Sequence, residues 1–160
     1  MDVEAIIKRL SEAHYPKAEA KKLIQEYASI PLTLPVSDEG VRRICEVLTQ
    51  NGYRTFDSCH GGKGHDRKVP DVWFICQMPD HVRHLAYILD HVCETQNIHW
   101  EVALTCGDPS SRLYYILKPH GPKELRRTPI DPVKDREALL IDIDVIGITI
   151  MDYFSDLKRK

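Results

Sequence analysis

No CxxC pair occurs in this sequence, and its five cysteines cannot all be joined to one another in disulfides. We therefore expect reduced thiols and a cytoplasmic location. No apolar run approaches the roughly 20 residues that a membrane-spanning helix requires. The acidic start Met-Asp-Val-Glu also differs from the basic start of a signal peptide. These absences argue against both a membrane protein and a secreted one.

A large excess of charge of either sign is also lacking, because the net charge is −2 over 160 residues. The whole chain therefore has no overall attraction to nucleic acid or to an anionic membrane, and such binding would need a local basic patch. The most basic stretch is 118–127, which we interpret as a solvated connector. A nucleic-acid partner is thus allowed but not favoured. The apolar fraction of 42% is ordinary for one globular domain.

The apolar pattern predicts both helices and strands. Spacings of three and four residues indicate helices, and short alternating or β-branched runs indicate strands. The predicted helices are 3–13, 16–27, 37–50, 79–93 and 139–157, and the predicted strands are 53–58, 72–76, 98–105 and 113–117.

This element order predicts an α+β fold with an antiparallel four-stranded sheet and helices on one face. Residues 1–30 form an N-terminal helical hairpin in this prediction, and residues 37–160 form a single α+β domain that ends in a long helix. Segment 139–150 is ambiguous, since Ile141 to Ile146 alternates like a strand. Leu139, Ile143 and Ile150 nevertheless keep helical spacing, and we predict a helix.

The loop between the first two predicted strands is the most concentrated chemistry in the chain. Residues 59–65 contain a thiol, two imidazoles, three glycines and a lysine. The loop is about a dozen residues long, and ordered loops of this length are more often functional than short turns are. We therefore place a ligand-binding or catalytic site at residues 57–65.

The glycines of this loop suggest an anion cradle. Gly61, Gly62 and Gly64 would let backbone N–H groups turn toward one point, as in loops that bind phosphate. Lys63 would add positive charge, and Asp57 and Ser58 would complete the ligand-binding residues. The ligand would be a phosphate-bearing small molecule, although no Walker motif is present.

A metal site is a second interpretation of the same loop. Cys59, His60 and His65 are suitable ligands for zinc or iron, with Cys106, His120 or Asp57 as further donors. Neighbouring strand residues point to opposite faces, however, which argues against Cys59 and His60 in one site.

Cysteine chemistry is a third interpretation. Cys59 would be the nucleophile, with His65 or His60 as the base and loop N–H groups as an oxyanion hole. Cationic neighbours can lower the pKa of a thiol in such a position. In this interpretation Cys59 and His65 are the catalytic residues.

Residues 52–74 also resemble part of a known group. The run Thr55-Phe56-x-Ser58-Cys59-x-Gly61-Gly62-x-Gly64-His65, followed by Pro70-x-Val72-x-Phe74, resembles a segment of small uncharacterised bacterial and phage proteins. The resemblance implies a family site at Ser58, Cys59, Gly61, Gly62, Gly64 and His65. It implies no activity, because none is assigned to that group.

A weaker similarity involves the wybutosine-synthesis tRNA methyltransferase family. Its Thr-x-Ser-Ser-Cys-Ser-Gly-Arg segment is similar to this chain at Thr55, Ser58, Cys59 and Gly61. This chain departs from that segment at Asp57 and Gly62. The resemblance would imply that the loop 118–127 contacts RNA.

Three functions follow from these interpretations. We expect a small-molecule site at residues 57–65, with a metal-binding protein that uses Cys59 and His65 as one alternative. The other alternative is a protein-interaction module in which the loop is structural and residues 1–30 bind the partner. The oligomeric state, the reaction type and the identity of the ligand stay open at this point.

Overall fold

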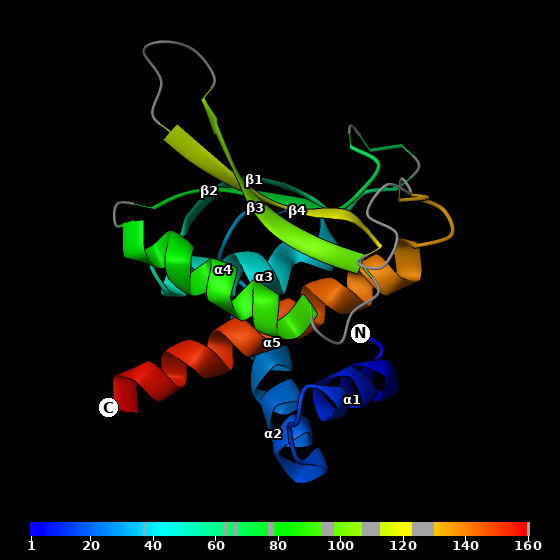
Figure 1. The fold of residues 1–160 in the computed structure, drawn as a ribbon, viewed down its shortest axis with the longest axis vertical. Helices are drawn as coiled ribbons and strands as arrows, with labels where there is room; N and C mark the ends of the chain where they lie inside the picture. The colour runs from blue at the N-terminus through cyan, green and yellow to red at the C-terminus, as the bar shows by residue number, and fades with distance from the viewer. Residues whose placement is uncertain are drawn as a thin grey trace.

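The computed structural model describes residues 1–36, 38–62, 64–65, 67–76, 79–93, 98–106, 113–122 and 130–159. Within these ranges the chain forms helices and strands in the order shown in Figure 1. The elements are α1 (Val3–Glu12), α2 (Lys17–Ala28), the 3-10 helix η1 (Glu39–Val41), α3 (Arg42–Gln50), β1 (Arg54–Cys59), β2 (Asp71–Ile75), α4 (Pro79–Cys93), β3 (Ile98–Cys106), β4 (Leu113–Pro122) and α5 (Arg136–Arg159).

The four strands form one antiparallel sheet in the order β1-β2-β4-β3. Helices α3, α4 and α5 lie on one side of this sheet, and α1 and α2 pack farther out against α5 (Figure 1). The predicted α+β fold, with its helices on one face, is therefore confirmed. No described helix combines the length and the hydrophobicity needed to cross a membrane.

The N-terminal hairpin shares the core of the sheet domain. Ile6 and Leu10 of α1 and Tyr27 of α2 belong to the same buried cluster as Phe74 and Trp100 of the sheet. Pairing the two amphipathic helices against α5 buries their apolar stripes, which neither helix could do alone.

Helix α5 confirms the prediction for residues 139–150. Its middle is buried on nearly every side, from Ile143 to Ile150, because α1 and α2 contact it on one side and α3 and α4 on the other. A helix surrounded in this way needs apolar residues at most positions, and this is why its sequence also resembled a strand.

Two side chains depart from the simple pattern of their elements. Alternation along β3 puts Leu104 on the same face as the buried Trp100, yet Leu104 is 58% exposed, since the end of the β3–β4 hairpin extends past the helices (Figure 1). His84 of α4 is half-buried, and its Nδ1 lies 2.7 Å from the hydroxyl of Tyr153.

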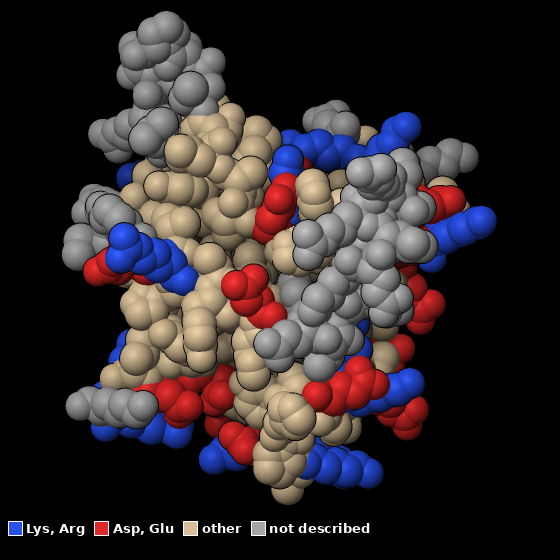
Figure 2. Space-filling view, in the orientation of Figure 1, with Lys and Arg blue, Asp and Glu red and all other residues tan. Residues whose placement is uncertain are grey.

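The surface seen in Figure 2 mixes both signs of charge. Basic and acidic side chains alternate along its lower edge and right side, and a wide uncharged area covers much of the rest. This face therefore shows no broad field of one sign among the described residues. Residues 118–122 of the basic stretch belong to β4 and not to a connector, and residues 123–127 lie outside the described residues.

Candidate functional site

Cys59 is the last residue of β1, and the loop that follows covers it. Cys59 is therefore only 5% exposed. The Gly61 N–H donates to Sγ at 3.3 Å, and the thiol is directed to the Arg67 carbonyl at 3.7 Å. Sulfur is thus enclosed by polar backbone groups rather than by an apolar core, which is an unusual setting for an inert structural cysteine.

Two glycines give the loop its sharp reversal. Gly61 and Gly62 have φ angles of 75° and 105°, in the left-handed region that favours glycine. A Cβ on Gly61 would lie 2.7 Å from the Lys68 carbonyl oxygen. The Gly62 N–H donates to that same oxygen at 3.1 Å, and the His65 N–H donates to the Gly62 carbonyl at 3.3 Å. These contacts return His65 to the end of β1.

The same contacts bear on the predicted anion cradle. The N–H groups of Gly61, Gly62 and His65 all donate within the loop, so these three are not directed to an external anion. Lys63 lies outside the described residues, and Gly64 is exposed, with open space where a Cβ would stand. The phosphate cradle stays a prediction. These three N–H groups do not support it, because none of them is free to bind a phosphate oxygen.

Asp38 is a site residue that the sequence reasoning missed. It directly precedes η1 and accepts a hydrogen bond from the His60 N–H at 3.0 Å. Burial alone would raise the pKa of Asp38. The His60 hydrogen bond and the rings of His60 and His65 outweigh that effect and hold the pKa below its usual value. Asp38 is therefore an anion beside the loop.

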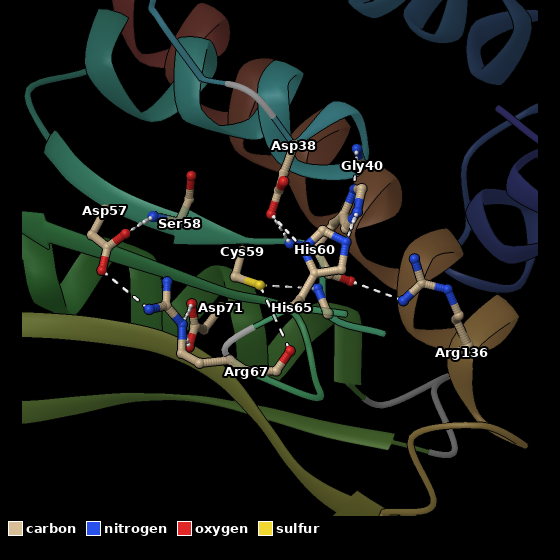
Figure 3. A network of polar contacts seen from close by, with 11 residues as sticks. Asp38, Gly40, Asp57, Ser58, Cys59, His60, His65, Arg67, Asp71 and Arg136 are labelled. Atoms are coloured by element: carbon tan, nitrogen blue, oxygen red, sulfur yellow. Dashed lines mark hydrogen bonds and ion pairs between the residues drawn. The ribbon is translucent and has the colours of Figure 1, made fainter. Parts of the chain in front are cut away.

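Asp38, Cys59 and His65 bring three metal-type donor atoms together. One oxygen, one sulfur and one nitrogen all lie within 4.8 Å of one another (Figure 3). Asp38 Oδ2 lies 3.5 Å from His65 Nδ1, which is long for a hydrogen bond. It is close to the separation of about 3.3 Å between two ligands of a tetrahedral zinc ion.

His60 plays a different part from His65. Its Nδ1 accepts the Gly40 N–H at 3.1 Å, so the proton of the neutral ring belongs on Nε2. That Nε2 lies 3.0 Å from Nε2 of His65 and is placed to donate to it. Burial lowers the pKa of His60, and the charges of His65 and Arg136 lower it further against the opposing effect of Asp38. His60 is thus a neutral partner of His65.

Arg136, the first residue of α5, is the second site residue that the sequence reasoning missed. Its Nη1 donates to the His60 carbonyl at 3.3 Å (Figure 3). The guanidinium packs directly on Gly62, where a Cβ would lie 2.5 Å from Nη1. Gly62 is therefore needed for this close approach as well as for its backbone angle. More than 70 residues separate the two in the sequence, and no local pattern links them.

The predicted residues Asp57 and Ser58 do not join the three donors. Asp57 binds Nη1 of Arg67 at 3.2 Å, and Arg67 also binds Asp71 and lies over the ring of Trp73. Ser58 pairs with Val72 and Cys59 with Asp71 in the sheet. Because successive strand residues point to opposite faces, the Ser58 side chain points away from the face that carries Cys59.

The further donors proposed for a metal site also lie elsewhere or cannot be placed. His120 lies on β4, with Nδ1 3.2 Å from Oε1 of Glu101. The side chain of Cys106 lies outside the described residues.

Comparison with known proteins gives no assignment, since no family model, curated protein or solved structure matches this chain.

Proposed function

We propose that this protein binds a transition-metal ion, with zinc as the best fit and iron as the alternative, through Asp38, Cys59 and His65. The observation that carries the proposal is the convergence of three donor atoms within 4.8 Å, one from the segment before η1 and two from the end of β1 and the loop after it. Oxygen, sulfur and nitrogen donors together suit zinc, which accepts all three in tetrahedral sites.

The surroundings of the donors support a bound cation. Asp38 has a lowered pKa and so supplies a full negative charge at neutral pH. The Gly61 N–H points to Sγ of Cys59 and would stabilise a thiolate, which is the form that binds metal. His60 faces the outer nitrogen of His65 at 3.0 Å. A metal bound at Nδ1 of His65 would place the proton of that ring on Nε2, so Nε2 of His60 would then accept a hydrogen bond instead of donating one.

Three protein ligands leave one position of a tetrahedral ion open. Zinc sites of this composition hold water or substrate there and act as Lewis acids. The side chains of Asp38 and His65 are 18% and 31% exposed, so a small molecule can reach the ion from solvent. The proposed metal would thus bind the anionic ligand that the glycine loop was expected to bind.

Metal content tests the proposal directly. Untagged protein purified without chelator should contain close to one zinc or iron per chain by elemental analysis. Cobalt(II) added to the metal-free protein should give a sulfur-to-cobalt charge-transfer band. Both signals should be lost in Cys59→Ser, His65→Ala and Asp38→Asn.

Each of these substitutions has a matched control elsewhere in the chain. Cys76→Ser, His120→Ala and Asp57→Asn change the same residue types outside the three donors and should leave metal binding intact. The proposal would be contradicted if the wild type bound no cobalt. It would also be contradicted if the site variants and the control variants bound metal equally well.

A further inference from the structure

Arg136 lies against the loop that joins two of the donors, Cys59 and His65, through Gly62 and the His60 carbonyl. Among the described residues no carboxylate lies within 4 Å of its guanidinium. Other arginines near the site differ in this respect. Arg42 pairs with Glu39, and Arg67 pairs with two aspartates. The positive charge of Arg136 is therefore not neutralised by a side chain in the described part of the chain.

Charge counting shows what this arginine adds to the proposed metal site. The anions of Asp38 and Cys59 would balance the two positive charges of the ion, and His65 would bind as a formally neutral ligand. Arg136 then leaves the site with one net positive charge beside an open coordination position. Such a site favours an anion over a neutral or cationic ligand.

We infer that the ligand of the open position is a phosphate group, held jointly by the metal ion and by Arg136; this inference rests on the proposed function. Guanidinium presents two N–H groups in a plane that matches two phosphate oxygens, and a further oxygen can bind the ion. The ligand class is then a phosphate ester of a small molecule. Gly62 serves this arrangement, because any side chain there would displace the guanidinium.

The experiment uses cobalt-loaded full-length protein and inorganic phosphate as the probe. Phosphate should change the visible cobalt spectrum in a saturable way in the wild type. Arg136→Gln should bind phosphate roughly tenfold or more weakly, since a charge-assisted contact is lost. Arg136→Lys, which keeps the charge without the planar fork, should fall between them. Arg83→Gln, a change of an exposed arginine on α4, should match the wild type.

The outcomes separate the phosphate inference from the proposed metal site on which it rests. Cobalt content and the spectrum without phosphate should be equal in all four proteins, which also shows that the site is folded. Phosphate binding of equal strength in Arg136→Gln and the wild type, or an unchanged wild-type spectrum, would overturn the phosphate inference and leave the metal site standing. Acetate acting as strongly as phosphate would overturn it in favour of a carboxylate ligand. Failure to bind cobalt at all would overturn the proposed function itself.

Discussion

Two polar clusters of this protein place a carboxylate among groups from distant parts of the chain. At the junction of α1 and α5, Asp142 accepts hydrogen bonds from Arg9 at 2.6 Å and from the Trp100 indole at 3.0 Å. At the end of β1, Asp38 faces Cys59 and His65 with an oxygen–nitrogen distance of 3.5 Å. In the first, closed cluster both carboxylate oxygens accept a hydrogen bond, although Nε and Nη2 of Arg9 are buried without a described partner. In the second, open cluster the donor atoms are spaced for a further atom between them.

The carboxylates of the two clusters also differ in how far they are buried. The side chain of Asp142 is 2% exposed, whereas that of Asp38 is 18% exposed. A buried carboxylate must have both oxygens satisfied by the protein, and Asp142 does. A partly exposed one can exchange water for a ligand. The comparison teaches that the closed cluster serves stability and that the open one is available for binding.

The largest effect is expected where the closed cluster is broken. Asp142→Ala removes the carboxylate that accepts hydrogen bonds from the Arg9 guanidinium and the Trp100 indole. Removing one partner of a buried ion pair typically lowers the free energy of unfolding by about 3–5 kcal/mol. Urea denaturation measures this, with Asp90→Ala on the exposed face of α4 as the control. A loss no larger than that of the control would refute the closed-cluster interpretation.

Asp144, two residues farther along α5, sharpens the comparison as a half-buried acid without an arginine hydrogen bond in the described structure. Burial raises its pKa to about 6 from the ordinary value of 3.8. The folded state then keeps a proton that the unfolded state loses, so stability falls as pH rises from about 4 to about 6 and stays lower above that. The total is at most about 3 kcal/mol.

Asp144→Asn should remove this contribution. The variant should be more stable than the wild type at pH 7, and the difference should shrink toward pH 4. Chemical denaturation across this pH range makes the measurement. A constant difference between the two proteins at every pH would be inconsistent with the raised pKa.

The open cluster should add to the stability of the protein only when metal is bound. Zinc at about 100 times its dissociation constant should raise the free energy of unfolding of the wild type by about 2.7 kcal/mol. Asp38→Asn should abolish that gain and change the stability of the metal-free protein little, since the amide oxygen can still accept the His60 N–H. Thermal unfolding with and without zinc measures both. An equal zinc effect in wild type and variant would remove Asp38 from the site.

The smallest effect tests the loop beside the open cluster. Gly62→Ala combines a left-handed backbone angle with a contact of 2.5 Å to Arg136, whereas Gly64→Ala has the angle without any close neighbour. We expect a cost of about 2 kcal/mol for the first and about 1 kcal/mol for the second. Denaturant unfolding of the two variants compares them, and equal costs would show that Arg136 simply moves aside.

The sequence allowed more of the fold to be predicted than of the site. Helical spacing located α1, α2 and α5. For the site, Cys59 and His65 were identified because they lie six residues apart in one loop. Asp38 and Arg136 were not, because each reaches the loop only through the packing of η1 and α5 against the end of β1.

The hydrophobic spacing and the glycine loop were enough to indicate an α+β domain and the stretch of chain that carries its chemistry, because both depend on short-range geometry. Which donor atoms meet was decided by tertiary structure. Strand alternation separated Ser58 from Cys59, the Gly40 N–H gave His60 its role beside His65, and the start of α5 brought in Arg136. Contacts between residues 20 to 76 positions apart depend on how elements pack, and no local pattern in the chain encodes that.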